Sequence, residues 1–90
     1  MSEIRFDWDP KKAEQNEKKH GVTFEDAETV FWDEQALLYE DPAPEDREDR
    51  FVLLGLSSSL RLLVVVHALR DRDTIRIISA RRATRRESGA

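Results

Sequence analysis

The sequence predicts an α+β fold: a small antiparallel β-sheet with two N-terminal helices packed on it and a short C-terminal helix. Helix signals fill the first third of the chain, and apolar runs separated by polar turns fill most of the second half. Ninety residues are enough for one core, so residues 1–90 are expected to form a single domain. Charged residues make up 38% of the chain, above the roughly 25% typical of globular domains, which predicts a heavily charged surface.

The first predicted elements are a short strand and a polar helix. Apolar and polar residues alternate over residues 4–8, which indicates a strand. Asp9 and Pro10 then begin a helix, because aspartate is a good N-cap and proline at the first helical position loses no needed donor. Gly21 is expected to end it. This helix is polar on nearly every side, so it should be held by docking through residues that share one face: Ala13, Asn16 and His20.

A second helix is predicted to begin at Thr23, with Asp26 three residues later approximating a capping box. Its apolar stripe should cover the sheet and consists of Phe24, Ala27, Val30 and Phe31. Ala36–Glu40 is predicted to be a short strand. Asp41–Glu48 carries two prolines and several acids, which is typical of a solvated loop.

Three further strands are predicted at Arg50–Leu56, Arg61–Leu69 and Thr74–Ala80, each rich in Val, Leu or Ile. Four-residue polar turns separate them. The middle strand is continuously apolar, as expected of a central strand covered on both faces. Arg81–Glu87 is predicted to begin the C-terminal helix.

Composition excludes several classes of protein. The absence of cysteine excludes a disulfide framework and thiolate metal sites, which suits a reducing cytoplasm. The longest apolar run, Leu62–Val66, is far shorter than the roughly 18 residues of a membrane span. The N-terminus lacks a secretory signal, and the two histidines lack ligand-like spacing. We therefore expect a cytoplasmic protein with no membrane partner, no metal site and no cofactor.

The charge is divided unevenly along the chain. Residues 1–60 hold 7 basic and 16 acidic side chains, a net charge of −9, whereas residues 61–90 hold 8 and 3, a net charge of +5. Nucleic-acid binding depends on where charge clusters rather than on its sum. The first functional indication is therefore a group of five arginines within eleven residues: Arg76, Arg81, Arg82, Arg85 and Arg86.

Turn length predicts which residues face each other across the strands. If Arg70–Asp73 is a four-residue loop, His67 lies opposite Arg76. If Ser57–Leu60 is also a four-residue loop, Arg50 lies opposite His67. The three polar side chains would then form one row across three strands, on one face of the sheet.

Such a row suits a phosphodiester substrate. Guanidinium groups stabilise the charge that develops on a pentacoordinate phosphorus, and an imidazole can transfer a proton near neutral pH. RNA cleavage by the neighbouring 2′-hydroxyl needs only a base, an acid and charge stabilisation. In the alternative interpretation, each arginine pairs with an acid or caps the sheet edge, and His67 is a packing residue.

Two other basic groups carry functional hypotheses. Lys12, Asn16 and Lys19 recur at helical spacing with His20 beside them, which suggests phosphate contact or help in catalysis. The alternative is a solvated helix in which Asn16 and His20 bond the backbone of the sheet. The arginine segment after the last strand is either an RNA-contacting or partner-contacting face or a frayed basic tail. Its candidate site residues are Arg81, Arg82 and Arg85.

Many short stretches of this sequence together form a recognisable pattern: Phe6–Asp9, Lys12, Asn16, Lys19–Val22, Phe24, Ala27, Phe31, Glu48, Arg50–Phe51, Gly55, Leu63–Val66 and Ile75–Arg81. In these positions the chain resembles the BrnT family of toxins from type II toxin–antitoxin systems. The resemblance spans about residues 6–87. Its specific parts are the Lys-His-Gly-Val block and the Ile-Ile-Ser-Ala-Arg block, in this order and separation.

The resemblance implies a RelE-like fold and a ribonuclease activity that halts translation. It also implies a ribbon-helix-helix antitoxin, BrnA, which covers the toxin in a 2:2 heterotetramer and alone contacts operator DNA. The implied site falls on Arg50, Arg76 and Arg81, with Lys19 and His20 near the sheet. A catalytic role for His67 does not follow from the resemblance.

The sequence therefore supports two hypotheses of function. The first is a metal-independent endoribonuclease toxin that is neutralised by its antitoxin. The second is an attenuated toxin-like module that acts as a scaffold or corepressor with its antitoxin on operator DNA. The acidic pI near 5.2 and a C-terminus that stops three residues after Glu87, where the family extends its last helix, favour the second.

Overall fold

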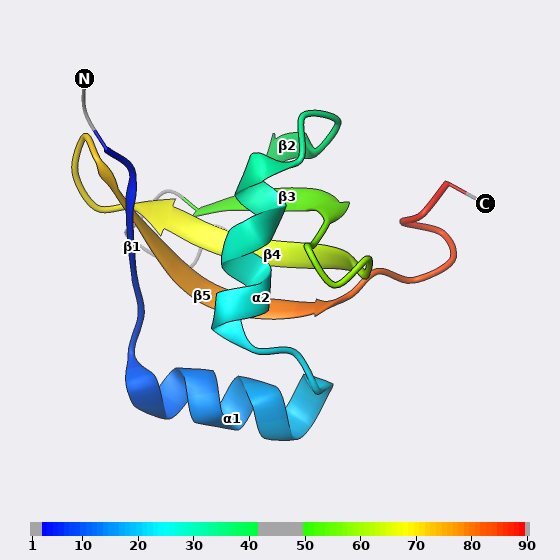
Figure 1. The fold of residues 1–90 in the computed structure, drawn as a ribbon, viewed down its shortest axis with the longest axis horizontal. Helices are drawn as coiled ribbons and strands as arrows, with labels where there is room; N and C mark the ends of the chain where they lie inside the picture. The colour runs from blue at the N-terminus through cyan, green and yellow to red at the C-terminus, as the bar shows by residue number, and fades with distance from the viewer. Residues whose placement is uncertain (1–2, 42–49, 90) are drawn as a thin grey trace.

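The computed structural model describes residues 3–41 and 50–89, so the predicted acidic loop lies almost entirely outside the described residues, as does Glu48. A five-stranded sheet has the order β1-β5-β4-β3-β2 and carries two α-helices (Figure 1). The strands are β1 Arg5–Asp7, β2 Leu37–Glu40, β3 Arg50–Leu56, β4 Leu62–Leu69 and β5 Thr74–Arg82. The helices are α1 Pro10–His20, α2 Phe24–Thr29 and the single 3₁₀ turn η1 Val30–Trp32. The predicted α+β class is confirmed.

The sheet is mixed, so the prediction of a purely antiparallel sheet is wrong. Strands β2 to β5 pair antiparallel, but β1 pairs parallel to β5, with Phe6 beside Ile75. The alternation at the N-terminus predicted a strand without saying where in the sheet it would insert. The sheet therefore places the first strand of the described chain beside the start of the last one.

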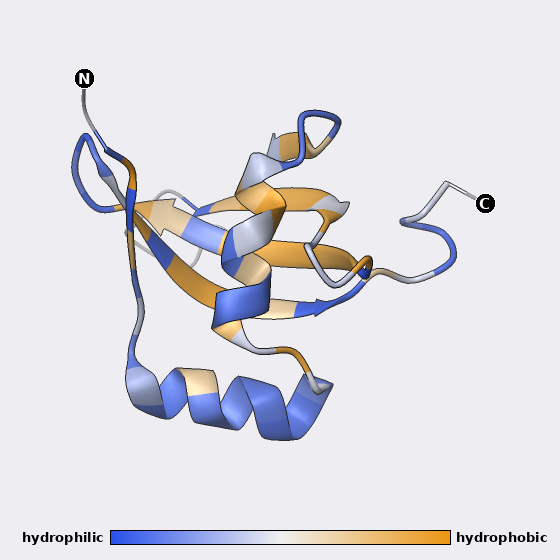
Figure 2. Cartoon of the chain, viewed as in Figure 1, coloured by the Kyte–Doolittle hydropathy of each residue, from blue (hydrophilic) through white to orange (hydrophobic). Residues whose placement is uncertain are grey.

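Helix α1 lies along the free part of the β5 edge rather than over a face of the sheet (Figure 1). Its ends are as predicted: Asp9 caps the N-terminus by accepting from the Lys11 amide, and Gly21 adopts the left-handed conformation, φ 69°, at the C-terminus. The helix is hydrophilic along nearly its whole length (Figure 2). The prediction that both helices pack on the sheet is therefore confirmed, with α2 on one face and α1 on the β5 edge.

Asn16 attaches α1 to the edge of β5. Its side-chain amide donates to the carbonyls of Ala80, 2.8 Å, and Val22, 3.0 Å, and its carbonyl accepts from the Ala80 amide at 3.1 Å. Strand β1 pairs with β5 only up to Arg76, so Asn16 satisfies backbone groups that β1 does not reach. The docking role predicted for Asn16 is confirmed.

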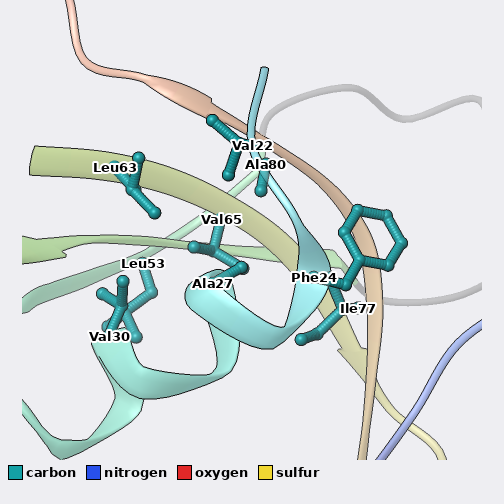
Figure 3. Close-up of a cluster of buried hydrophobic side chains, with 9 residues drawn as sticks. All are labelled: Val22, Phe24, Ala27, Val30, Leu53, Leu63, Val65, Ile77 and Ala80. Carbon is teal, nitrogen blue, oxygen red and sulfur yellow. The ribbon is translucent and has the colours of Figure 1, made fainter. Parts of the chain in front are cut away.

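Helix α2 covers one face of the sheet and closes the core. Thr23 caps it by accepting from the Asp26 amide at 3.0 Å, as predicted. Figure 3 shows the side chains of α2 and η1 against those of the sheet. The fully enclosed core consists of Val22, Phe24, Ala27, Val30, Leu53, Leu63, Val65, Ile77 and Ala80.

The C-terminal segment forms turns, so the predicted C-terminal helix is absent from the described residues. The start signal is present: the Thr84 hydroxyl accepts from the Glu87 amide at 3.2 Å, and the Glu87 carboxylate accepts from the Thr84 amide at 2.8 Å. A single turn follows, closed by the Ser88 amide on the Thr84 carbonyl at 2.9 Å. Nucleating a helix is costly, and this one turn brings too few hydrogen bonds to extend it.

Candidate functional site

The hairpin turns set the register differently from the prediction. The Ser57 amide donates to the Arg61 carbonyl at 2.9 Å, which leaves a three-residue loop with Leu60 at φ 65°. The Arg70 amide likewise donates to the Thr74 carbonyl at 2.9 Å. Each loop is one residue shorter than predicted, and a shift of one residue moves a side chain to the other face.

The predicted row of Arg50, His67 and Arg76 is therefore wrong. His67 lies opposite Phe51 on β3 and Ile77 on β5, on the face covered by α2. The two arginines lie on the other face, one on each side of Ala68.

His67 is a packing residue in an aromatic cluster. It is 3% exposed, with its ring centroid 4.8 Å from that of Phe31 and 6.0 Å from that of Phe51. Its Nδ1 lies 3.2 Å from the Val65 carbonyl oxygen. Burial lowers the pKa of His67, because the charged imidazolium would lose its hydration. The structure supports the packing alternative and does not bring this imidazole to the arginines.

The face of the sheet opposite α2 collects three arginines, and we call it the arginine face. Arg50 and Arg76 both pair with Ala68, so their Cα atoms are about 10 Å apart at the usual strand spacing. A bulge at Val66/His67 shifts the register of β5, and Arg81 consequently lies opposite Val64 on this same face. The three arginines predicted to be site residues thus lie on one surface: Arg50, Arg76 and Arg81.

The apolar positions between the arginines are buried. Val64 is 3% exposed and Ala68 1%, and Val52 on β3 is 7% exposed. Arg76 and Arg81 lie five residues apart on β5, about 15 Å at the rise of a strand. The arginine face therefore spreads positive charge over the length expected of an extended backbone contact rather than around one point.

Arg76 is paired with an acid across the parallel strands. Its Nη1 lies 3.6 Å from Oδ1 of Asp7, the residue that faces it on β1. Both side chains are partly exposed. The pair holds the Arg76 guanidinium beside the β1 edge, and a partly exposed pair of this kind contributes little to stability.

Arg81 forms a bidentate pair with Glu87. Its Nη1 and Nη2 donate to Oε1 and Oε2 of Glu87, both at 2.7 Å. The hydrogen bonds to Glu87 raise the pKa of Arg81; the same bonds, together with that from the Thr84 amide, lower the pKa of Glu87 to about 2. The prediction did not include Glu87 or Asp7 in the site. The Thr-x-x-Glu spacing of Thr84 and Glu87 is the sequence signal that indicates the first of these.

The other predicted site residues lie on α1 and at or after the end of β5. Lys12 and Lys19 are exposed on α1, on either side of buried Asn16, and His20 is half-buried at the end of that helix. Asn16 bonds the sheet backbone, as the alternative interpretation held, so it does not belong to a basic RNA-facing stripe. Two predicted residues remain, and both are exposed: Arg82 is the last residue of β5, and Arg85 lies in the turn that follows.

Two shallow hollows lie at opposite ends of the sheet, and neither is lined by Arg50, Arg76 or Arg81. One is formed by Leu60, Arg61, Leu62, Arg82 and Ala83. Within residues 3–41 and 50–89, no group of three or more histidine or acidic side chains could hold a metal ion. In the same part of the chain, no helix is long and apolar enough to cross a membrane.

Comparison with known proteins agrees with this architecture. The crystal structure of the Brucella abortus ribonuclease toxin BrnT, at 1.1 Å resolution, superposes with a TM-score of 0.67 and 24% sequence identity. The similarity covers 94% of this chain and 100% of that one, and it shows a shared fold. No curated protein matches the chain.

The chain thus forms a mixed five-stranded sheet with three arginines on one face. Residues 8–87 match the family described as the ribonuclease toxin, BrnT, of type II toxin–antitoxin systems. The chain belongs to this BrnT family, which confirms the resemblance drawn from the sequence. Membership of a type II toxin–antitoxin family implies an antitoxin partner.

Proposed function

We propose that this protein is a metal-independent endoribonuclease whose substrate lies across the arginine face, and that its cleavage of RNA inhibits translation. The observation that carries the proposal is the convergence of Arg50, Arg76 and Arg81, from two strands, on one face of a sheet in a ribonuclease toxin family. Guanidinium groups bind phosphate oxygens by parallel hydrogen bonds and keep their charge at every relevant pH.

The proposed reaction uses the substrate's own 2′-hydroxyl. This oxygen attacks the adjacent phosphorus, the bond from phosphorus to the 5′-oxygen breaks, and a 2′,3′-cyclic phosphate and a 5′-hydroxyl result. Arginine side chains stabilise the extra negative charge on the phosphoryl oxygens in the transition state. The chemistry requires one group to accept the 2′-hydroxyl proton and one to donate a proton to the leaving oxygen.

We assign proton transfer to His20 in this proposal, since His67 is enclosed on the opposite face. His20 lies one helical turn after Asn16, which is bonded to Ala80, the neighbour of Arg81. Lys12 and Lys19 on the same helix, with Arg82 and Arg85, would extend phosphate contact beyond the arginine face. If His20 transfers the proton, the His20→Gln variant cleaves RNA at least tenfold more slowly than the parent. Unchanged cleavage by the His20→Gln variant would contradict the assignment.

The proposed partner is a BrnA-like ribbon-helix-helix antitoxin in a 2:2 complex. The antitoxin would cover the arginine face and contact operator DNA, with the toxin reaching DNA only through it. The family match supports a protein antitoxin. Co-expression with the neighbouring reading frame, followed by mass measurement of the purified complex, tests both the partner and the stoichiometry.

A second candidate function has a specific observation in its favour. Arg76 pairs with Asp7, and Arg81 pairs with Glu87, so both guanidiniums hold a carboxylate of this chain. Such pairing is also what an attenuated toxin would show, one that acts as a scaffold or corepressor with its antitoxin. Under this alternative, Arg81→Ala weakens antitoxin or operator binding and leaves the growth of cells unchanged.

Cleavage of a single-stranded RNA by the purified protein in excess EDTA tests the leading proposal. We expect products with 2′,3′-cyclic phosphate and 5′-hydroxyl ends, and at least a tenfold lower rate for Arg76→Ala and Arg81→Ala. Arg72→Ala, in the exposed β4–β5 loop, is the matched control and should cleave normally. Intact RNA with the parent protein, together with normal growth of cells that express it, would reject the endoribonuclease function.

A further inference from the structure

The Arg81 guanidinium is part of a site whose hydrogen-bond donors bind a carboxylate. Oε1 of Glu87 accepts from Arg81 Nη1 at 2.7 Å and from the Thr84 amide at 2.8 Å, and Oε2 accepts from Arg81 Nη2 at 2.7 Å. Arg81 Nη1 also donates to the Arg82 carbonyl at 3.2 Å, which fixes the orientation of the guanidinium. Three donors therefore converge on one carboxylate group.

The Arg81 donors come from the sheet, whereas the Thr84 amide and the Glu87 acceptor both come from the terminal turn. Arg81 belongs to β5 and is paired with Val64 in the centre of the sheet, and the neighbouring Ala83 amide donates to the Leu62 carbonyl at 2.9 Å. Glu87 lies beyond the last backbone contact with the sheet, in the one-turn segment closed by the Ser88 amide. The sheet therefore fixes the backbone of Arg81 independently of Glu87, and a donor that is positioned in advance favours the binding of an oxyanion.

We propose that the Arg81 guanidinium and the Thr84 amide form a binding site for one phosphate group of single-stranded RNA, and that Glu87 occupies it as an internal substitute for that phosphate. This inference rests on the proposed function, because it assigns one substrate phosphate to the arginine face. A phosphate offers two oxygens in the same fork geometry as the Glu87 carboxylate. Glu87 then competes with RNA for Arg81.

Glu87 leaves the site because RNA competes with it for Arg81, and not because its carboxylate is protonated. The low pKa of Glu87, about 2, keeps its carboxylate charged throughout the physiological range. The side chains remain accessible, 41% exposed for Arg81 and 24% for Glu87, so solvent screens the ion pair and an RNA phosphate can reach the guanidinium. An RNA strand with additional contacts to Arg50 and Arg76 brings several charges at once, so it can displace a single carboxylate.

The test compares two neutralising substitutions in the full chain, Glu87→Gln and Glu14→Gln. Glu14 on α1 is paired with Lys18 at 3.4 Å and is 72% exposed, so its loss gives the same change of charge away from Arg81. The probe is a single-stranded 2′-O-methyl oligoribonucleotide, which binds but has no 2′-hydroxyl to react. We expect Glu87→Gln to bind it more tightly than Glu14→Gln by roughly threefold to tenfold.

The same comparison in an Arg81→Gln background shows whether the gain passes through Arg81. We expect the advantage of Glu87→Gln to disappear there. Equal affinities of the two neutralised variants, or a gain that persists without Arg81, would overturn the inference even if the parent protein cleaves RNA. Circular dichroism spectra identical to the parent exclude loss of the fold as the cause of any difference.

Inorganic phosphate separates this inference from the proposed function. If the parent protein neither binds the oligoribonucleotide nor cleaves RNA, the proposed function fails, and phosphate alone then tests the oxyanion site. We expect phosphate to shift the Arg81 side-chain ¹⁵N signal in Glu87→Gln at concentrations that leave the parent signal unchanged. An Arg81 signal unmoved by phosphate in Glu87→Gln would overturn the site itself.

Discussion

Replacing Asn16 with leucine, at similar side-chain volume, removes two hydrogen bonds from α1 to Ala80 at the sheet edge and one to Val22 between α1 and α2. Asn16 is 7% exposed, so water cannot substitute freely for the lost partners. The Ala80 amide and carbonyl and the Val22 carbonyl would all lose their acceptor or donor. Since one buried hydrogen bond contributes about 1 kcal/mol and an unsatisfied group costs about 1–3 kcal/mol, we expect a total loss of about 3 kcal/mol.

This loss is large for a chain of 90 residues, whose free energy of unfolding should be roughly 5–13 kcal/mol. In urea unfolding, with a slope of about 1–2 kcal/mol per molar, the midpoint should fall by about 2 M. Gln15→Leu is the matched control, because Gln15 is exposed on the same helix. A loss below about 0.5 kcal/mol for Asn16→Leu would refute the view that Asn16 anchors α1.

Asn16→Asp adds a test by pH. The new carboxylate would face two carbonyl oxygens in a buried position, so its pKa should be raised in the folded state. A folded pKa above the unfolded value means that stability falls as pH rises through the interval between the two. We therefore expect Asn16→Asp to be more destabilising at pH 7 than at pH 4. The opposite order would contradict the assigned hydrogen-bond pattern.

Two further predictions follow from packing and burial. His67→Phe should leave RNA cleavage unchanged, and reduced cleavage would contradict a packing role. The lowered pKa of His67 makes the parent lose stability as pH falls below about 6.5. The variant should therefore lose less stability than the parent on acid titration. Gly55→Ala should destabilise the protein by about 1–3 kcal/mol in urea unfolding. Its new Cβ would lie 2.8 Å from the Ala36 Cβ and 2.9 Å from the Val30 Cγ1, and unchanged stability would contradict that close packing.

Local signals in the sequence predicted most of the elements. Caps at Asp9 and Thr23 and the left-handed Gly21 are local properties, so both helices begin, and α1 ends, where expected. The apolar stripe predicted for the second helix ran to Phe31, whereas α2 ends at Thr29 and a 3₁₀ turn follows. The place of β1 depends on pairing with β5, some seventy residues away in sequence, and no local signal carries that information. The C-terminal helix failed because a correct start signal does not supply the contacts that extend a helix.

The site was predicted in its residues more than in its geometry. Arg50, Arg76 and Arg81 share a face, but His67 was placed among them by turns counted one residue too long. A three-residue loop at residues 58–60 was hard to predict, because such a loop needs a residue with positive φ and that residue is usually glycine. Here Leu60 adopts the positive φ instead. The bulge at Val66/His67 then brought Arg81 onto the arginine face, which alternation from Arg76 alone would not do.

The central claim is that RNA lies across the arginine face. Its most direct test follows the side-chain Nε–Hε signals of ¹⁵N-labelled arginines during titration with a 2′-O-methyl oligoribonucleotide, each signal assigned by an Arg→Lys variant. The account predicts that the signals of Arg50, Arg76 and Arg81 move, while those of Arg70 and Arg72 in the β4–β5 loop stay in place. Movement confined to the loop arginines, with the three on the sheet unchanged, would contradict it.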